Sequence, residues 1–118
     1  MSLLTDKLKN LEERHALAVT ALGIEASKAR MIELEGDMSD PGFWNEQEKA
    51  RKIAQEMGDL KKEVEAWESI GAEIKETHDV VLMTESEGSA EDKAESERLV
   101  VDLEQRFTAM EFQMLFSG

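Results

Sequence analysis

The sequence lacks cysteine and tyrosine altogether, and Pro41 is its single proline. Without cysteine it has no disulfide framework, thiolate zinc site or cysteine nucleophile, so nothing indicates an oxidising compartment. Aromatic residues make up only 5% of the chain. No apolar run approaches the roughly 20 residues of a membrane-spanning helix, and the first residues do not resemble a signal peptide. We therefore expect a cytoplasmic protein that contacts no membrane.

Basic residues are also scarce, because 14 lysines and arginines face 27 aspartates and glutamates, for a formal net charge of -13. Tight binding of a nucleic-acid backbone depends on lysine and arginine side chains that replace its counterions. Direct, tight nucleic-acid binding is therefore not expected, and a basic protein is the better candidate partner. A length of 118 residues suits one domain, 1–118.

The residues that are abundant favour helices, since glutamate, alanine, leucine, lysine and methionine dominate the composition. Apolar or seam residues recur at spacings of three and four, the pattern of helices that pack on one another. In the first segment these are Leu4, Leu8, Leu11, His15, Ala18 and Leu22. A shorter segment carries Ile24, Met31, Leu34 and Met38. The longest carries Ile53, Met57, Leu60, Val64, Trp67, Gly71, Ile74, His78 and Val81, and the last carries Leu99, Leu103, Phe107, Met110 and Met114.

Glycine, proline and capping residues divide these segments. Gly23 is expected to end the first helix, and Gly88 the long one, with Ser89 and Asp92 capping the last helix. The segment 36–48 is the strongest break, where Asp40 before Pro41, or Asn45 with Glu48, can cap the start of the long helix. The pattern predicts an all-α helical bundle built on a long antiparallel helical hairpin with two shorter N-terminal helices. Within the long helix, Gly58 and Gly71 indicate either a close neighbour or a bend.

Three acidic patterns in the sequence resemble metal or catalytic sites in part. Glu12 and His15 match half of a di-iron bundle motif, but the second half is missing because Lys75 stands where a carboxylate is needed before His78. The segment 37–48 resembles a calcium loop, but Pro41 occupies a ligand position. The remaining paired carboxylates are typical of a solvated helical surface. We therefore expect no catalytic residue, no metal and no cofactor.

A cluster of acids surrounds the predicted turn near Gly88. We take its members as a candidate protein-contact tip: Glu87, Glu91, Asp92 and Glu95. The tip either binds a basic protein or only keeps the turn soluble.

The segment 38–50, Met-Ser-Asp-Pro-Gly-Phe-Trp-Asn-Glu-Gln-Glu-Lys-Ala, resembles the N-terminal domain of the bacterial peptide chain release factor 2 family. The likeness continues through 60–67 and returns at 110–118, which ends in Leu-Phe-Ser-Gly. The residues that carry this family signature, which we interpret as structural, are Ser39, Asp40, Pro41, Phe43, Trp44, Asn45, Phe116, Ser117 and Gly118. Phe43 and Trp44 are interpreted as core rings, with an anchor between short and long helices as the alternative.

The resemblance implies a role in translation termination. The intact factors of this family read UAA and UGA codons through a Ser-Pro-Phe tripeptide and hydrolyse peptidyl-tRNA through Gly-Gly-Gln, and neither motif occurs in this sequence. The chain thus looks like the N-terminal domain alone, a non-enzymatic helical arm that docks on the ribosome. The implied partners are the basic protein at the stalk base of the large subunit and the recycling GTPase release factor 3. The alternative is a free-standing acidic coiled-coil adaptor or homodimer.

Overall fold

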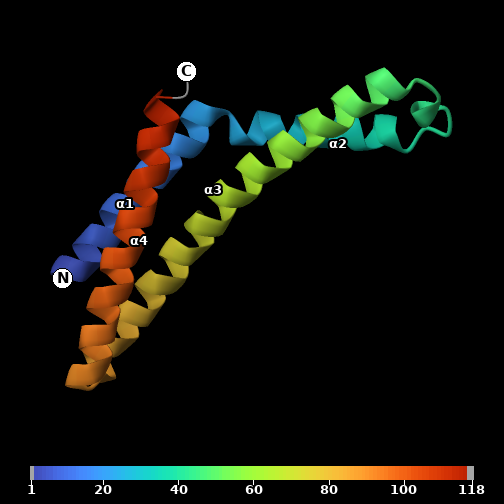
Figure 1. The fold of residues 1–118 in the computed structure, drawn as a ribbon. Helices are drawn as coiled ribbons and strands as arrows, with labels where there is room; N and C mark the ends of the chain where they lie inside the picture. Colours follow the sequence, from blue (N-terminus) through green and yellow to red (C-terminus); the bar gives the residue numbers. More distant parts are fainter. Residues whose placement is uncertain (1, 117–118) are drawn as a thin grey trace. The chain divides into compact units, whose positions relative to one another are not determined.

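The computed structural model describes residues 2–116 as four α-helices and one 3-10 turn (Figure 1). The helices are α1 (Leu3–Leu22), α2 (Ile24–Met38), α3 (Gln47–Glu87) and α4 (Ala90–Phe116), and the 3-10 turn η1 (Phe43–Asn45) precedes α3. The described residues contain no β-strand. Across residues 2–116, no helix combines the length and the apolar character needed to cross a membrane. The predicted all-α class and the long helical hairpin are confirmed.

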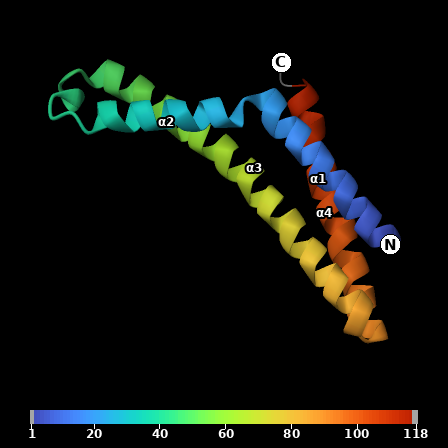
Figure 2. The same cartoon turned by 180° about the vertical axis from the view of Figure 1, so that it is seen from behind.

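The chain separates into two compact units, which we describe one at a time. The first unit comprises Met1–Ala18 and Ser69–Gly118, so it contains most of α1, the second half of α3 and all of α4. These three helical segments run side by side (Figures 1 and 2). Each contributes one face to a shared core of Leu8, Leu11, Ala18, Ile70, Ile74, Val81, Val100, Leu103 and Phe107. Packing of these faces, rather than helix propensity alone, is what stabilises such helices in water.

One part of the predicted core register is wrong. Leu99 was expected on the buried face of α4, but it is 40% exposed, whereas its neighbour Val100 is fully buried. Ser96 and Leu103, four residues before and three residues after Val100, are also buried. The buried face therefore passes through Val100. The apolar pattern did not predict this register, because Ser96 occupies one position of the buried face and is not apolar.

The second unit, Val19–Glu68, is a hairpin of α2 and the first half of α3 (Figures 1 and 2). Its buried apolar residues include Ile24 and Leu34 of α2 and Ala50, Val64 and Trp67 of α3. Two ion pairs join the helices at the surface, Lys28 to Glu68 and Arg30 to Glu56, each at 2.8 Å. Because the guanidinium of Arg30 donates to the Glu56 carboxylate, the pKa of Glu56 lies below its usual value.

The predicted helix ends at Gly23 and Gly88 are confirmed, whereas those predicted around 36–48 are wrong in part. Gly23 follows α1 in the left-handed region, with φ of 65°, which suits glycine because it has no Cβ. Gly36, in contrast, lies inside α2 rather than ending it, and Pro41 lies in a turn rather than at the first position of a helix. Asn45 is part of η1, so it does not occupy the capping position immediately before α3.

The turn between α3 and α4 contains the predicted capping box. The Ser89 backbone N–H donates to the Asp92 carboxylate at 3.1 Å, and the Asp92 N–H donates to Ser89 Oγ at 3.2 Å. Replacement of Ser89 by alanine removes one of these bonds, so we expect the free energy of unfolding to fall by about 1 kcal/mol. Urea denaturation measures this loss. Ser89→Asp is the matched control, since aspartate is an equally good cap, and a loss there equal to that of alanine would contradict the capping role.

Gly71 makes room for a ring of the neighbouring helix. A Cβ at this position would lie 2.5 Å from Cε1 and 2.6 Å from Nε2 of His15. We expect Gly71→Ala to destabilise the protein by about 1 kcal/mol, because overpacking of about 1–3 kcal/mol exceeds the gain in helix propensity of about 1 kcal/mol. Thermal or urea unfolding measures the change.

Gly58 offers the matched control, because nothing lies within 4 Å of a Cβ placed there. Gly58→Ala is expected to stabilise by up to about 1 kcal/mol, the propensity term alone. In a His15→Ala background Gly71→Ala is expected to stabilise as well. If Gly71→Ala still destabilised in that background, the ring of His15 would not be the cause.

An ion-pair network on the first unit makes a pH-dependent contribution to the free energy of unfolding. Arg106 bonds Glu73 of α3 and, at 2.8 Å, Asp102 of its own helix. The hydrogen bond from Arg106 lowers the pKa of Glu73 below its usual value. Glu73 therefore stabilises the fold above its unfolded-state pKa of about 4.3, and this contribution is lost as the pH falls through the lowered folded-state pKa.

We expect Arg106→Gln to reduce stability at neutral pH by no more than about 1 kcal/mol, because both side chains are partly exposed and screened by solvent. The difference from the parent protein is expected to shrink as the pH falls below about 4. Urea titrations across this range measure it. A difference that stayed constant down to the lowest pH would show that Arg106 acts by packing rather than by charge.

Candidate functional site

The acidic tip lies at the α3–α4 turn of the first unit, and all four of its members are exposed. Asp92 is engaged in the capping box, and Glu95 accepts from Arg98 at 2.6 Å. Among the described residues, no hydrogen bond or ion pair involves the side chain of Glu87 or Glu91. Two of the four predicted contact residues thus bond other groups of the protein, and the carboxylates of the other two are exposed to solvent.

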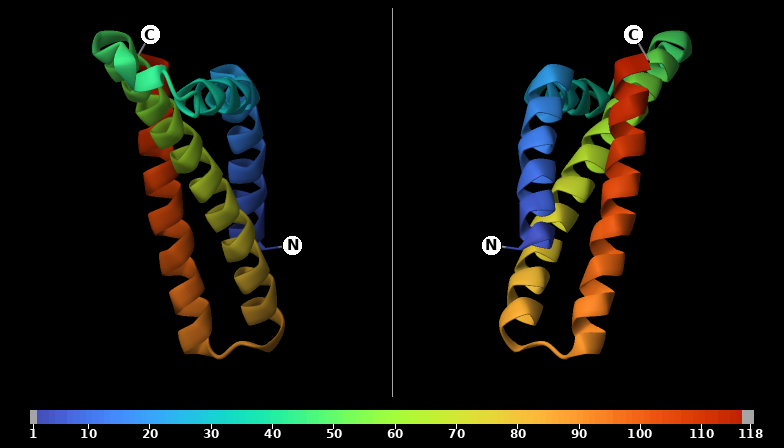
Figure 3. Two further views of the ribbon diagram at one scale, coloured as in Figure 1. Left: turned by 90° about the vertical axis from the view of Figure 1, so that its right-hand side faces the viewer. Right: turned by 90° about the vertical axis from the view of Figure 1, so that its left-hand side faces the viewer.

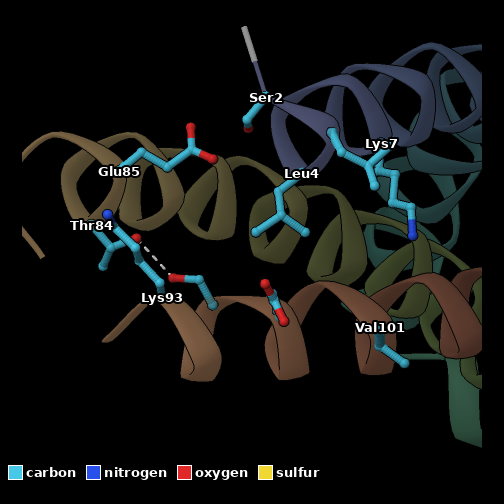
Figure 4. Close-up of a pocket in the computed structure, with 10 residues that line it drawn as sticks. Ser2, Leu4, Lys7, Thr84, Glu85, Lys93 and Val101 are labelled. Carbon is cyan, nitrogen blue, oxygen red and sulfur yellow. Dashed lines mark hydrogen bonds between the residues drawn. The ribbon is translucent and has the colours of Figure 1, made fainter. Parts of the chain in front are cut away.

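A cavity of about 620 Å³ opens beside this tip (Figure 4). In this part of the first unit α3 and α4 extend past the first turn of α1 (Figure 3). Its apolar wall comes from Leu3 and Leu4 of α1 and Val101 of α4. The charged lining residues are Lys7, Glu85, Lys93 and Glu97. In Figure 4 the side chain of Leu4 points into the space between α3 and α4.

Two hydroxyl groups form part of the cavity lining. Thr84 Oγ1 and Ser96 Oγ lie 2.8 Å apart and share a hydrogen bond (Figure 4, dashed line). Thr84 Oγ1 also donates to the Val81 carbonyl at 3.2 Å. Ser96 is 1% exposed, so its hydroxyl is buried but satisfied within the protein.

The signature turn closes the hairpin of the second unit and is held by its own backbone. Ser39 ends α2, where its Oγ donates to the Glu35 carbonyl at 2.9 Å. The Asp40 carboxylate accepts from the Gly42 N–H at 3.2 Å, and the Phe43 N–H donates to the Asp40 carbonyl at 3.0 Å. The Asn45 N–H donates in turn to Gly42 at 3.2 Å. The side chains of Ser39 and Asp40 thus fix the path of the chain through the turn.

The interpretation of Trp44 as a core ring is wrong. The Trp44 side chain is 59% exposed, whereas Phe43 is half-buried. The two rings meet edge to face, with centroids 4.8 Å apart. Trp44 therefore leaves a large apolar surface in contact with water at the closed end of the hairpin.

The last signature residues lie at and beyond the end of α4. Phe116 is 73% exposed, and its ring packs on that of Phe112 with centroids 4.4 Å apart. Ser117 and Gly118 lie outside the described residues.

The two histidines that the sequence offers as candidate metal ligands contact other side chains of the first unit. His78 Nδ1 lies 2.7 Å from Glu12 Oε1, so the carboxylate that pairs with His15 in sequence bonds the other histidine. The ring of His15 lies 6.5 Å from that of Phe107. No group of three or more histidine, cysteine, aspartate or glutamate residues in 2–116 is arranged to hold a metal ion.

Comparison with known proteins assigns the chain to a family. The PCRF domain matches residues 27–117, which include the signature turn and the acidic tip. The chain belongs to the PCRF domain family. Its curated relatives include peptide chain release factors 2 of several bacteria, so the resemblance drawn from the signature turn is confirmed.

Two such relatives share 30% identity with this PCRF domain chain. The factor of Aeromonas hydrophila aligns over 118 positions, and that of Rickettsia bellii over 111 positions. The alignments cover 96% and 94% of this chain but only 31% and 30% of the relatives. A factor from Exiguobacterium is 29% identical over 93% of the chain and 29% of its own length. The chain thus spans just under a third of the relatives that it matches.

Two features of this PCRF domain were missed by sequence reasoning. One feature of the sequence could have indicated the cavity beside the tip. Thr84 and Ser96 occupy positions on the packed faces of α3 and α4, where apolar residues are usual, and both carry hydroxyl groups. No feature indicated the exposure of Trp44, since a tryptophan beside a turn is as compatible with burial as with exposure.

Proposed function

We propose that this chain is the ribosome-docking N-terminal domain of a class I peptide chain release factor, acting in bacterial translation termination at UAA and UGA codons. The PCRF domain match over residues 27–117 carries this proposal. Release factors 2 that align over 93–96% of the chain support it. The same proposal implies work in the cytoplasm, where ribosomes translate.

In this proposal the domain neither reads the codon nor hydrolyses peptidyl-tRNA. Its 118 residues contain neither a Ser-Pro-Phe nor a Gly-Gly-Gln sequence. We assign those steps to other parts of the longer factors, and we treat 1–118 as one helical docking domain. The signature residues of the 39–45 turn hold the second unit closed, in line with their backbone and side-chain hydrogen bonds.

The proposed partners are the basic protein at the stalk base of the large subunit and, secondarily, release factor 3. Support comes from the net charge of -13 and from the solvent-facing carboxylates of Glu87 and Glu91. A homodimeric adaptor has less support, because the apolar seams of α1, α3 and α4 are already buried within a single chain. A mass of 13.3 kDa by light scattering would agree with a monomer.

Cosedimentation with purified bacterial large ribosomal subunits tests the docking role. We expect saturable binding that weakens with added salt, as contacts between acidic and basic groups do. Full-length release factor 2 of Aeromonas hydrophila is expected to displace the chain. Absence of binding, or binding that the full-length factor does not displace, would contradict the proposal.

The acidic tip is tested in the same assay with Glu87→Gln combined with Glu91→Gln. The matched control carries Glu65→Gln and Glu76→Gln, which remove the same charge from exposed positions of α3 outside the tip. Weaker binding of the tip variant alone would support contact at the tip. Equal weakening of both variants would show only a general effect of net charge.

A further inference from the structure

The cavity beside the acidic tip has the shape and surroundings of a receptor for part of a partner helix. We propose that it receives one apolar side chain of a basic amphipathic helix from a protein partner, with lysine or arginine residues of that helix facing Glu85 and Glu97. This inference rests on the proposed docking function and specifies which surface is used and what chemistry it recognises.

The cavity is large enough to admit one apolar side chain together with part of the helix that carries it. Its volume of about 620 Å³ is within the range of ligand pockets in proteins, about 300–1,000 Å³. It lies between the start of α1 and the facing parts of α3 and α4. A groove with apolar walls between helices is the setting in which an amphipathic partner helix places its apolar face.

The lining can accept an apolar group without loss of hydrogen bonds. Leu3, which is 71% exposed, and Val101, which is 46% exposed, would bury apolar surface against an incoming side chain. The hydroxyls of Thr84 and Ser96 already bond one another. An apolar occupant would therefore leave these two hydroxyls paired, and it would avoid the cost of covering an unpaired polar group at that part of the lining.

The charges around the cavity select a basic partner. Between residues 84 and 101 the sequence has six acidic residues and two basic ones, Lys93 and Arg98, and Lys7 of α1 adds a third basic residue at the cavity. Arg98 is already paired with Glu95, whereas Glu85 and Glu97 have no ion-pair partner among the described residues. The excess negative charge opposes an RNA backbone and favours a helix that carries lysine or arginine beside its apolar residue.

Fluorescence anisotropy with a designed peptide tests the chemistry directly. The probe is a labelled amphipathic helix of leucine and lysine, and its control has every leucine replaced by glutamine at the same charge. We expect the leucine peptide to bind at least about tenfold more tightly, a difference of about 1.4 kcal/mol. Equal affinities would mean that charge alone attracts the peptide, and this would overturn the inference.

Substitutions of Val101 and of the nearby Leu99 locate the binding site. Val101→Glu places a charge in the cavity wall, whereas Leu99→Glu places the same charge on α4 outside the cavity lining, at a residue of similar exposure, 40% against 46%. An added glutamate attracts a basic peptide, so electrostatics alone would strengthen binding in both variants. We expect instead that Val101→Glu weakens binding of the leucine peptide about tenfold and that Leu99→Glu changes it less than twofold.

Val101→Gln is a second variant, and it is expected to weaken binding in the same direction without a change in charge. Far-UV circular dichroism checks that each variant retains its helices. If Val101→Glu and Val101→Gln both bound the leucine peptide as the parent does, the cavity would not be the receptor.

A crosslinking experiment with ribosomes separates this inference from the proposed function. A photoreactive phenylalanine analogue at position 101 is expected to crosslink to a basic helix of a large-subunit protein, and the same analogue at position 99 is not. Ribosome binding that is insensitive to Val101→Glu, or a crosslink to ribosomal RNA, would overturn the inference and leave the docking function standing. Absence of ribosome binding by the parent would overturn the docking function, while the peptide titrations would still decide the chemistry of the cavity.

Discussion

Replacement of Trp67 by alanine is expected to lower the free energy of unfolding by roughly 3–5 kcal/mol. Trp67 is 5% exposed in the core of the second unit, where Val64 and Ile24 are also buried. Truncation removes a large apolar surface from that core and leaves a cavity that its neighbours fill only in part. Urea denaturation followed by circular dichroism measures the loss.

Trp44 supplies the matched control, since it is the only other tryptophan of the chain and is 59% exposed. We expect Trp44→Ala to cost less than about 1 kcal/mol, the range of exposed edge-to-face ring contacts and surface substitutions. Similar losses for the two variants would mean that the burial assigned to Trp67 is wrong.

Replacement of Phe107 by alanine is expected to cost a similar amount, roughly 3–5 kcal/mol, in the first unit. Its ring is fully buried, and the Arg14 guanidinium lies 5.1 Å from the ring centroid. Arg14 also bonds Glu111 at 2.6 Å, and this bond raises the pKa of the guanidinium. Loss of the ring would therefore remove both core packing and a cation–π contact.

Phe112 lies on the same helix and is 60% exposed. Phe112→Ala is expected to cost at most about 1 kcal/mol, because its main ring contact is with the exposed Phe116. Hydrogen exchange offers a second readout, since only Phe107→Ala should reduce protection of amides in α1 and α4 together. A comparable loss of protection in both variants would contradict the assigned core.

The helices and their boundaries were largely predictable, because apolar periodicity, Gly23, Gly88 and Ser89 act locally along the chain. The register of α4 was not, because Leu99 and Val100 are both apolar and only packing against α1 and α3 selects Val100. Ser96 lies on the same buried face, and its hydroxyl can be buried there because it shares a hydrogen bond with Thr84, twelve residues earlier. Such pairings between helices are set by tertiary contacts, which single-sequence periodicity does not encode.

The candidate site was predictable only in part. The acidic tip follows from composition around a turn, but the internal bonds of Asp92 and Glu95 do not, so the sequence overstates the number of carboxylates that face solvent. The exposure of Trp44 depends on the path of the 39–46 turn, where short backbone hydrogen bonds decide which way each ring faces. The cavity depends on where α1 begins relative to α3 and α4, a property of three segments far apart in the chain.

The division of the chain also has a consequence for synthesis on the ribosome. The first unit is assembled from the two ends of the chain, as the bond between Arg14 and Glu111 across 97 residues shows, whereas the second unit is continuous. At about 5–20 residues per second, the partners of α1 in α4 are made roughly 5–20 seconds after α1 itself. The α2–α3 hairpin can thus fold while α1 still lacks a partner for Leu8 and Leu11. The nascent chain therefore exposes an apolar helix face early, and chaperones that bind such faces would meet this protein at its first segment.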